Sequence, residues 1–299
     1  MEMFNKNFCY IDDVLTTRGK GPFDKKKYCY EKDNLDPDCY SKKLYKDLAK
    51  VCSGTINGHR FQFDDDNLKL KLIVDGNEDK CYRFSSDFIN PCSKFIKEEY
   101  EFSDETLAKW FHESRVLGGH IIFCRHGQAR SINKAKGGKP TYDRFDLCLD
   151  EIHDFFLNNN GKGKHSNGLR NAIKDDKEFF ALFGEGKEGF QNYVKFFKLT
   201  DFVDKDYNVI SLAWSDIVEN KIFSIDTEYN DINKYKGTEL KKYYTYLPGR
   251  NLYVKRVEED KEKKEPTLEE EKDYAIKYVN NVLSLIKRRN DKMYLDLIK

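Results

Sequence analysis

The chain has 299 residues, of which 39% are hydrophobic, 35% charged and 14% aromatic. This length accommodates one large domain or two smaller ones, with a sizeable core in either case. The 22 Phe and 19 Tyr residues bury large areas, which argues against disorder over most of the chain. A formal net charge of +1 excludes a global field that attracts nucleic acid or membranes, so electrostatic recognition must be local.

The eight cysteines include no Cys-x-x-Cys pair, which excludes zinc-ribbon spacing. No signal peptide is recognisable, and no apolar run approaches the ~18–20 residues that span a bilayer. We therefore expect a cytoplasmic protein with free thiols and no membrane partner. No motif identifies a metal site or names a cofactor.

The first part of the chain predicts helices around a small sheet. A helix is predicted from Ser41 to Val51, with that serine as its N-cap. The Asn57-Gly58 turn signal and the alternation that follows it predict an antiparallel meander from about 59 to 84. Apolar residues at helical spacing predict a further helix over 103–115, which Gly118-Gly119 ends.

A predicted strand, basic loop and helix follow one another between residues 118 and 156. The loop, 125–142, contains five Lys or Arg residues and no acid, and a helix over 143–156 follows it. Unpaired N–H groups and the positive end of the dipole at a helix N-terminus favour an anion. The loop is therefore predicted to contact phosphate, or else to be a solvated loop that lacks acids.

The C-terminal third predicts more helices, two strands and a linker. Helices are expected near 175–183 and 189–197, and strands at 207–212 and 222–225. A charge run at 258–266 is predicted to be a linker, and residues 267–299 a helix that docks on the body or binds a partner. We expect an α+β (or α/β) fold: one domain over 1–257, with a mixed sheet, flanking helices and this C-terminal helix.

The predicted site lies in the basic loop and at the start of the helix after it. The ligand-binding candidates are Arg125, Arg130, Asn133, Lys136, Gly137 and Arg144. The candidate acid–base residues are Asp143, Asp146 and His126. The two aspartates also suit a helix cap and a dipole partner, and that structural alternative is favoured for them.

Two other groups of acidic residues carry weaker predictions. Asp146, Asp150 and His153 share one helical stripe, which we expect to be a solvated face rather than a metal site. Asp226 and Glu228 follow a predicted strand and are separated by one residue. This Asp-x-Glu spacing occurs in some metal-dependent nucleases, and it also occurs in ordinary turns. Neither group is predicted to bind a metal.

Two segments resemble the hallmark of a bacterial family of unknown function, Ile-Asn-x-Ala-Arg-Gly followed by Asp-Arg-Phe-Asp-Leu-Thr-Leu. They are Ile132–Gly137 and Asp143–Leu149, with Lys136 in place of the family's Arg and Cys148 in place of its Thr. Lysine lacks the planar fork of arginine, which argues against a bidentate role at that position. Shorter matches are Asp36-Pro37-Asp38, Tyr40-Ser41, Asn57-Gly58, Ser85-Ser86-Asp87, Phe196–Val203 and Arg289-Asn290.

The resemblance implies a bacterial or phage-borne protein but no activity. Our leading hypothesis is that the strand–loop–helix site binds a nucleotide or nucleic acid. A role in bacterial–phage conflict is suggested only by association, because uncharacterised families of this kind often have such roles. One alternative is a non-catalytic interaction or inhibitor protein that binds a protein partner through its C-terminal helix. Another is an ADP-ribosyl-type transferase that uses NAD, with Arg125 and Glu228 in the site. Whether the protein is an enzyme stays open.

Overall fold

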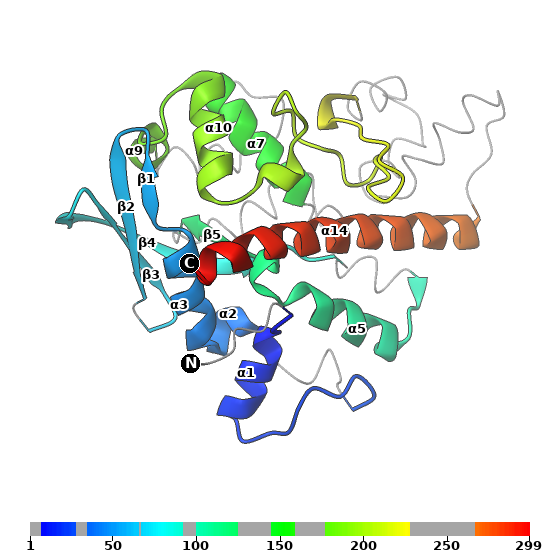
Figure 1. Ribbon diagram of the computed structural model, residues 1–299. Coiled ribbons are helices and arrows are strands. Elements are labelled where there is room, and N and C mark those ends of the chain that lie inside the picture. Colours follow the sequence, from blue (N-terminus) through cyan, green and yellow to red (C-terminus); the bar gives the residue numbers. More distant parts are fainter. Residues whose placement is uncertain are drawn as a thin grey trace.

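A five-stranded antiparallel sheet forms one side of the computed structural model (Figure 1). The structure describes residues 7–27, 35–65, 67–91, 100–124, 145–158, 177–227 and 267–299. The strands follow chain order: β1 Gly54–Ile56, β2 His59–Asp65, β3 Leu70–Val74, β4 Asn77–Phe88 and β5 His120–Cys124. The predicted α+β class and meander are confirmed.

The prediction of a mixed sheet is corrected in one respect, because all four pairings of the described strands are antiparallel. Two-residue turns join β1 to β2 and β3 to β4, and such turns permit only antiparallel neighbours. Asn57 and Gly58 have φ of 48° and 78°, and Asp75 and Gly76 have φ of 54° and 76°. Positive φ at both central residues is the requirement of a type I′ hairpin, which Asn-Gly and Asp-Gly meet at low cost.

The described helices cover the sheet and surround one large core, and a smaller apolar cluster lies between α1 and α5. They are α1 Tyr10–Thr17, α2 Pro37–Tyr40, α3 Lys42–Val51, α5 Asp104–Ser114, α7 Phe145–Leu157, α9 Lys177–Ala181, α10 Gly186–Phe196 and α14 Leu268–Leu297, with the 3-10 turns η1 Leu117–Gly119 and η3 Thr200–Phe202. The predicted N-cap Ser41 is confirmed, since it accepts a backbone N–H group of α3. Ser103 caps α5 in the same way, and Thr267 forms a capping box with Glu270 at the start of α14. Helix α1 was not predicted.

Phenylalanine rings join the sheet to α9 and α10. The ring of Phe61 lies 5.3 Å from that of Phe183 and 4.9 Å from that of Phe196, between centroids. Phe84 lies 4.9 Å from Phe179 in an edge-to-face arrangement. Such pairs add to the burial of their large areas, so the aromatic composition of the chain serves the core.

Helix α14 crosses the molecule between α7 and α10 on one side and α5 on the other (Figure 1). Its predicted apolar stripe is buried at Ala275, Val279, Val282 and Ile286, in the same core as the sheet. The docking alternative for this helix is therefore confirmed, whereas the linker at 258–266 lies outside the described residues. None of the described helices combines the length and apolar composition needed to cross a bilayer.

The strands predicted at 207–212 and 222–225 form only isolated bridges, such as Ile210 with Ser224. The two segments pair around this bridge, where Ser211 donates its N–H to the carbonyl oxygen of Phe223 and Ile225 donates to that of Val209. At Leu212 the pairing stops: its N–H donates to Asp146, and its carbonyl oxygen accepts from the side chain of Asn281 of α14. Tertiary contacts thus limit the predicted β-ladder to a short bridge.

Arg289 of α14 ties together segments that are far apart in the sequence. Its side chain is 1% exposed, and its guanidinium donates to the carbonyl oxygens of four residues: Gly118 (2.7 Å), His120 (2.6 Å), Phe197 (3.0 Å) and Lys198 (3.1 Å). Burial lowers the pKa of Arg289 to about 10, so the group stays charged at neutral pH. The cation thus satisfies carbonyl groups of η1, β5 and the end of α10 together.

The glycines of η1 allow this approach. Asn290 accepts the N–H of Gly118 at 2.9 Å, so α14 and η1 are in direct contact. A Cβ atom on Gly118 would overlap the backbone of Asn290, and one on Gly119 would overlap the carbonyl oxygen of Ser114. The Gly-Gly pair therefore has a packing role as well as the predicted role of ending the helix.

We predict that Arg289→Met lowers the free energy of unfolding by at least about 3 kcal/mol, because four buried carbonyl groups lose their donor. Urea denaturation measures the change. The neighbouring Arg288→Met is the matched control: Arg288 is exposed and donates only one bond of 3.3 Å, so its loss should cost less than about 1 kcal/mol. Equal effects of the two substitutions would contradict the role given to Arg289.

Candidate functional site

Most of the predicted site lies outside the described residues. This applies to Arg125, His126, Arg130, Asn133, Lys136, Gly137, Asp143 and Arg144, whose roles stay predictions. The two flanks are as predicted: β5 ends at Cys124 and α7 begins at Phe145.

Asp146 is the one candidate acid–base residue within the described chain. Its side chain is fully buried, and its Oδ2 accepts the backbone N–H of Leu212 at 2.8 Å. This contact is structural, but it joins α7 to a distant segment and is neither the helix cap nor the dipole contact that the sequence favoured. The expected solvated stripe is wrong, because Asp150 is also buried and the ring of His153 packs against that of Phe190 in a tilted arrangement, with centroids 4.5 Å apart. Helix α7 packs on α10 through this region, which removes the stripe from solvent.

The structure draws attention instead to a second buried arginine, Arg115, at the C-terminus of α5. Among the described residues, Arg115 and Arg289 are the two largest side chains that are fully buried. The Arg115 guanidinium lies over the rings of Phe88 and Phe111, at 3.3 Å and 4.0 Å from their centroids. Its Nη1 donates to Ser114 Oγ at 2.6 Å. Two rings and one hydroxyl therefore hold the guanidinium in place.

One edge of this guanidinium is buried but makes no hydrogen bond to the described residues. Within the described part of the chain, Nε and Nη2 of Arg115 are buried and have no hydrogen-bond partner. These two nitrogens are adjacent, and their N–H bonds point in the same direction, which is the fork that binds two oxygens of one carboxylate or phosphate. Leaving buried donors unsatisfied costs about 1–3 kcal/mol each. An oxyanion is the ligand that would satisfy both.

His120, the first residue of β5, forms the second part of the site. Its side chain is 0% exposed, and its Nδ1 lies 3.0 Å from Asp38 Oδ1 and 3.4 Å from Ser86 Oγ. Its Nε2 is buried and contacts no hydrogen-bonding group among the described residues. A carboxylate that holds one ring nitrogen and leaves the other unpaired is the arrangement of a general base.

Arg115 and His120 belong to one cluster. Phe88, which carries the guanidinium on its ring, is the residue directly opposite His120 in the β4–β5 ladder. The charges of both Arg115 and His120 lower the pKa of Asp36, although burial and the neighbouring Asp38 have larger effects and raise it. We call Asp36, Asp38, Arg115 and His120 the Arg115–His120 cluster.

Local structure positions the acidic side of the cluster. Asp36 caps α2 by accepting the N–H of Asp38 at 3.2 Å, with Pro37 as the first helical residue. The Tyr45 hydroxyl of α3 donates to the carbonyl oxygen of Asp38 at 2.9 Å. Arg289 holds the carbonyl of His120, so three of the short resemblance segments, at 36–38, 85–87 and 289–290, meet around this cluster.

The comparisons with known proteins agree with that resemblance. The chain belongs to a family of unknown function, DUF6994. The family's sequence model matches residues 24–293 and so includes the whole Arg115–His120 cluster. No curated protein and no solved structure matches the chain. The predicted membership of a family of unknown function is confirmed.

The sequence contained little that could reveal Arg115 or His120 in this DUF6994 chain. Arg115 ends an amphipathic helix, where a cation ordinarily interacts with the dipole and solvent. His120 follows two glycines at the start of an apolar strand. The one available signal was that short resemblance segments near Asp36 and Arg289 had no role of their own.

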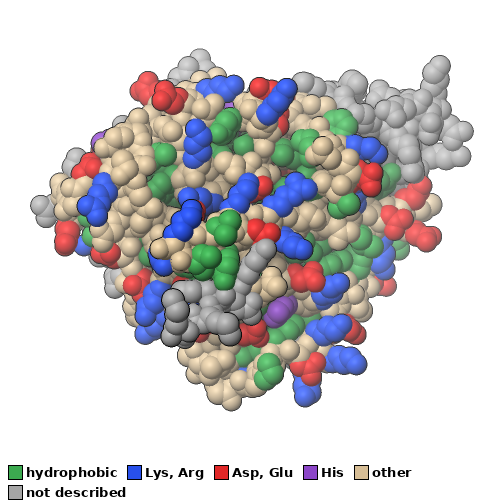
Figure 2. Space-filling view, viewed as in Figure 1, with side chains coloured by type: hydrophobic (Ala, Val, Ile, Leu, Met, Phe, Trp, Pro, Cys, Tyr) green, Lys and Arg blue, Asp and Glu red, His purple; other side chains and the backbone are tan. Residues whose placement is uncertain are grey.

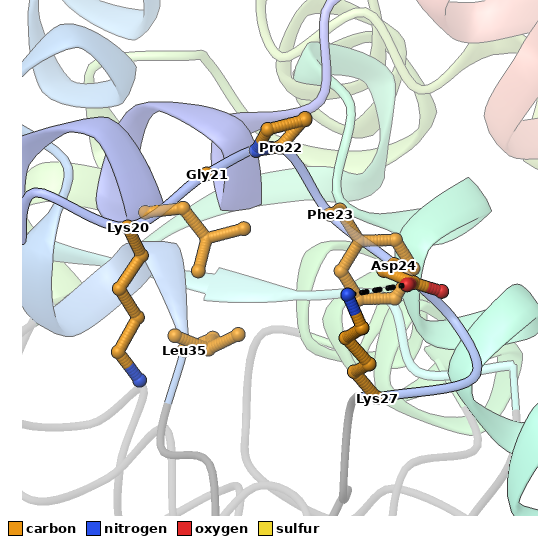
Figure 3. A pocket seen from close by; sticks show the side chains of 8 residues that line it. Lys20, Gly21, Pro22, Phe23, Asp24, Lys27 and Leu35 are labelled. Atoms are coloured by element: carbon orange, nitrogen blue, oxygen red, sulfur yellow. Dashed lines mark ion pairs between the residues drawn. The ribbon is translucent and has the colours of Figure 1, made fainter.

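A pocket of about 430 Å³ includes in its lining Leu35, the residue directly before Asp36 of the cluster. Leu15 and Leu35 line it and pack in the same apolar group as Phe111, whose ring supports Arg115. The side chains of Lys20 and Lys27 extend on either side of Leu35 (Figure 3). Lys27 pairs with Asp24, which also lines the pocket, at 3.5 Å (Figure 3), so the lining combines apolar side chains with charges of both signs.

We predict that Arg115→Met changes the free energy of unfolding by less than about 1 kcal/mol, although the side chain is fully buried. Methionine fits against the two rings, and the loss of one hydrogen bond is offset by the removal of two unsatisfied donors. Urea denaturation beside Arg289→Met tests the contrast between the two arginines. A loss above about 2 kcal/mol would assign Arg115 a purely structural role.

We also predict that Asp36→Asn stabilises the protein at pH 7 and that this gain shrinks as the pH approaches 3.8. Burial raises the pKa of Asp36 above its ordinary value of 3.8, so the folded state binds this proton more tightly than the unfolded state. The free energy of unfolding of the wild type therefore falls as the pH rises from 3.8 through the higher pKa of Asp36 in the folded state. Asparagine still caps α2. Urea unfolding of both proteins at several pH values measures the gain, and a gain independent of pH contradicts the prediction.

Proposed function

We propose that this protein binds a phosphate-bearing ligand, a nucleotide or nucleic acid, with the Arg115–His120 cluster as its buried oxyanion site. The observation that carries the proposal is the open Nε/Nη2 edge of Arg115. A fixed guanidinium fork matches two oxygens of a phosphate and gains more from a charged acceptor than from a neutral one.

The basic segment 125–142 supports phosphate over other oxyanions. Strand β5 starts at His120 in the cluster and ends at Cys124, directly before this segment of five Lys or Arg residues. A five-residue strand spans roughly 13 Å. We propose that the segment supplies the outer contacts of an extended polyanionic ligand, through Arg125, Lys136 and Arg144.

The face formed by α10 and α14 is a poor alternative surface for nucleic acid. Figure 2 shows Lys and Arg side chains interspersed with Asp and Glu across it. Lys292 pairs with Asp201 at 2.8 Å, and Lys198 pairs with Asp296 at 2.9 Å. Paired charges of mixed sign give no sustained attraction for a phosphate backbone.

The hydrogen bond between Asp38 and His120 favours a second candidate function, acid–base chemistry on the bound phosphate ester. With Nδ1 held by Asp38, Nε2 of His120 is placed to take or give a proton at the ligand. Because Arg115 and His120 are fully buried, a ligand must displace side chains to reach them, and association should be slower than at an open site. The neighbouring pocket is the side from which we propose that it enters.

A thermal-shift screen of the full chain tests the proposal with inorganic phosphate, nucleotides, NAD and short oligonucleotides, with citrate as a carboxylate control. A ligand at 100 times its dissociation constant should add about 2.7 kcal/mol of stability. Arg115→Met should abolish the shift. Arg60→Met, which alters an exposed arginine on β2, should retain it.

The outcomes separate the alternatives. Loss of the shift in Arg144→Ala with a full shift in Arg115→Met would place the ligand at the basic segment alone and overturn the role of Arg115. A shift with NAD only, lost in Glu228→Gln, would favour the transferase alternative. No shift with any phosphate compound would reject the proposal.

A further inference from the structure

We propose that Cys9, Asp12 and His112 form a binding site for Zn²⁺ between α1 and α5. One ligand atom of each of the three side chains lies within 4.8 Å of the other two. Among the described residues, this is the one group of three or more His, Cys, Asp or Glu side chains with such spacing. None of the three side chains belongs to the Arg115–His120 cluster, although Cys9 packs in the same apolar group as Phe111, whose ring supports Arg115.

One edge of the group, between Asp12 and His112, is close to the edge of a tetrahedral site. Asp12 Oδ2 and His112 Nε2 are 3.7 Å apart. Zinc bonds of about 2.0–2.1 Å at tetrahedral angles place nitrogen and oxygen ligands about 3.4 Å apart. A shift of a few tenths of an ångström, within reach of two half-buried side chains, closes this edge. The fourth position would hold water or a ligand, as in zinc sites with three protein ligands.

The chemistry of the three ligands selects zinc over the common hard cations. Thiolate, imidazole and carboxylate are the zinc ligands of proteins, whereas Mg²⁺ and Ca²⁺ prefer oxygen alone. The thiolate and the carboxylate together balance the charge of a divalent ion. Zinc displaces the thiol proton of Cys9, whose Sγ otherwise donates to the carbonyl oxygen of His112 at 3.3 Å.

The surroundings orient the ligands and leave a route for the ion. The backbone N–H of Phe23 donates to Asp12 Oδ1 at 3.4 Å, which leaves Oδ2 for the metal. The ring of Phe23 stacks on His112 at 4.5 Å and fixes the imidazole plane. Cys9 is 1% exposed, whereas the side chains of His112 and Asp12 are 31% and 40% exposed. The ion therefore enters from solvent above a buried sulfur.

The site depends on a helix that the family match does not include. Cys9 precedes α1 as its N-cap and Asp12 lies in its first turn, and both come before residue 24, where the match begins. His112 lies in the last turn of α5, inside the match. A bound zinc ion would therefore link α1 to α5. Phe23 also lines the pocket of Figure 3, so the metal site adjoins that pocket.

Titration of the chelator-treated full chain with Co²⁺, and displacement of Co²⁺ by Zn²⁺, tests the proposal. Cobalt bound to a thiolate gives a charge-transfer band in the near ultraviolet. One equivalent should saturate the wild type, and Cys9→Ser should abolish the band. Asp12→Asn and His112→Gln should weaken apparent affinity at least tenfold.

Matched controls alter a thiol and an imidazole outside the site. Cys39→Ser and His59→Gln change an exposed cysteine and a histidine of β2, and both should leave the band and its stoichiometry intact. Asp12 and His112 are half-exposed, so their variants give a result even where Cys9→Ser fails to fold. Absence of the band in the wild type, its persistence in Cys9→Ser, or unchanged affinity in both other variants would overturn the site.

Discussion

The guanidinium of Arg289 is the contact on which the arrangement of this protein depends. It donates to carbonyl groups of η1, of the first residue of β5 and of the segment after α10, and Asn290 adds a bond to Gly118. A buried cation surrounded by carbonyl oxygens tolerates little displacement, because each lost bond leaves a polar group unsatisfied in the core. The position of α14 therefore determines the position of His120.

Arg115 and Arg289, the two fully buried arginines of the described chain, have opposite environments. Arg289 uses every guanidinium nitrogen on backbone oxygens. Arg115 is held on its faces by Phe88 and Phe111, yet its bidentate edge meets no acceptor in the described chain. Natural proteins tolerate such unsatisfied groups mainly where a ligand or a reaction uses them. The same reasoning applies to Nε2 of His120.

Local patterns predicted much of the fold and little of this site. Ser41, Ser103 and Thr267 marked helix starts correctly, because capping is a contact between a side chain and its own helix. Asn57-Gly58 marked a hairpin through its preference for positive φ. The strands expected at 207–212 and 222–225 are reduced to a short bridge, because Asp146 and Asn281, distant in sequence, bind the backbone N–H and carbonyl oxygen of Leu212. This long-range contact of Asp146 could not be read from its position at a helix start.

By itself, the sequence determined the class of the fold, most helix boundaries, the meander and the basic composition of segment 125–142, since these follow from periodicity, capping and local charge. Only the tertiary structure decided that α14 lies within the core, that α7 buries its aspartates, and that Asp36, Asp38, Arg115 and His120 meet. Such proximity arises from the packing of α2, α5 and β5 around Arg289. No local pattern records which distant side chains will share a desolvated site, because that depends on the packing of the whole chain.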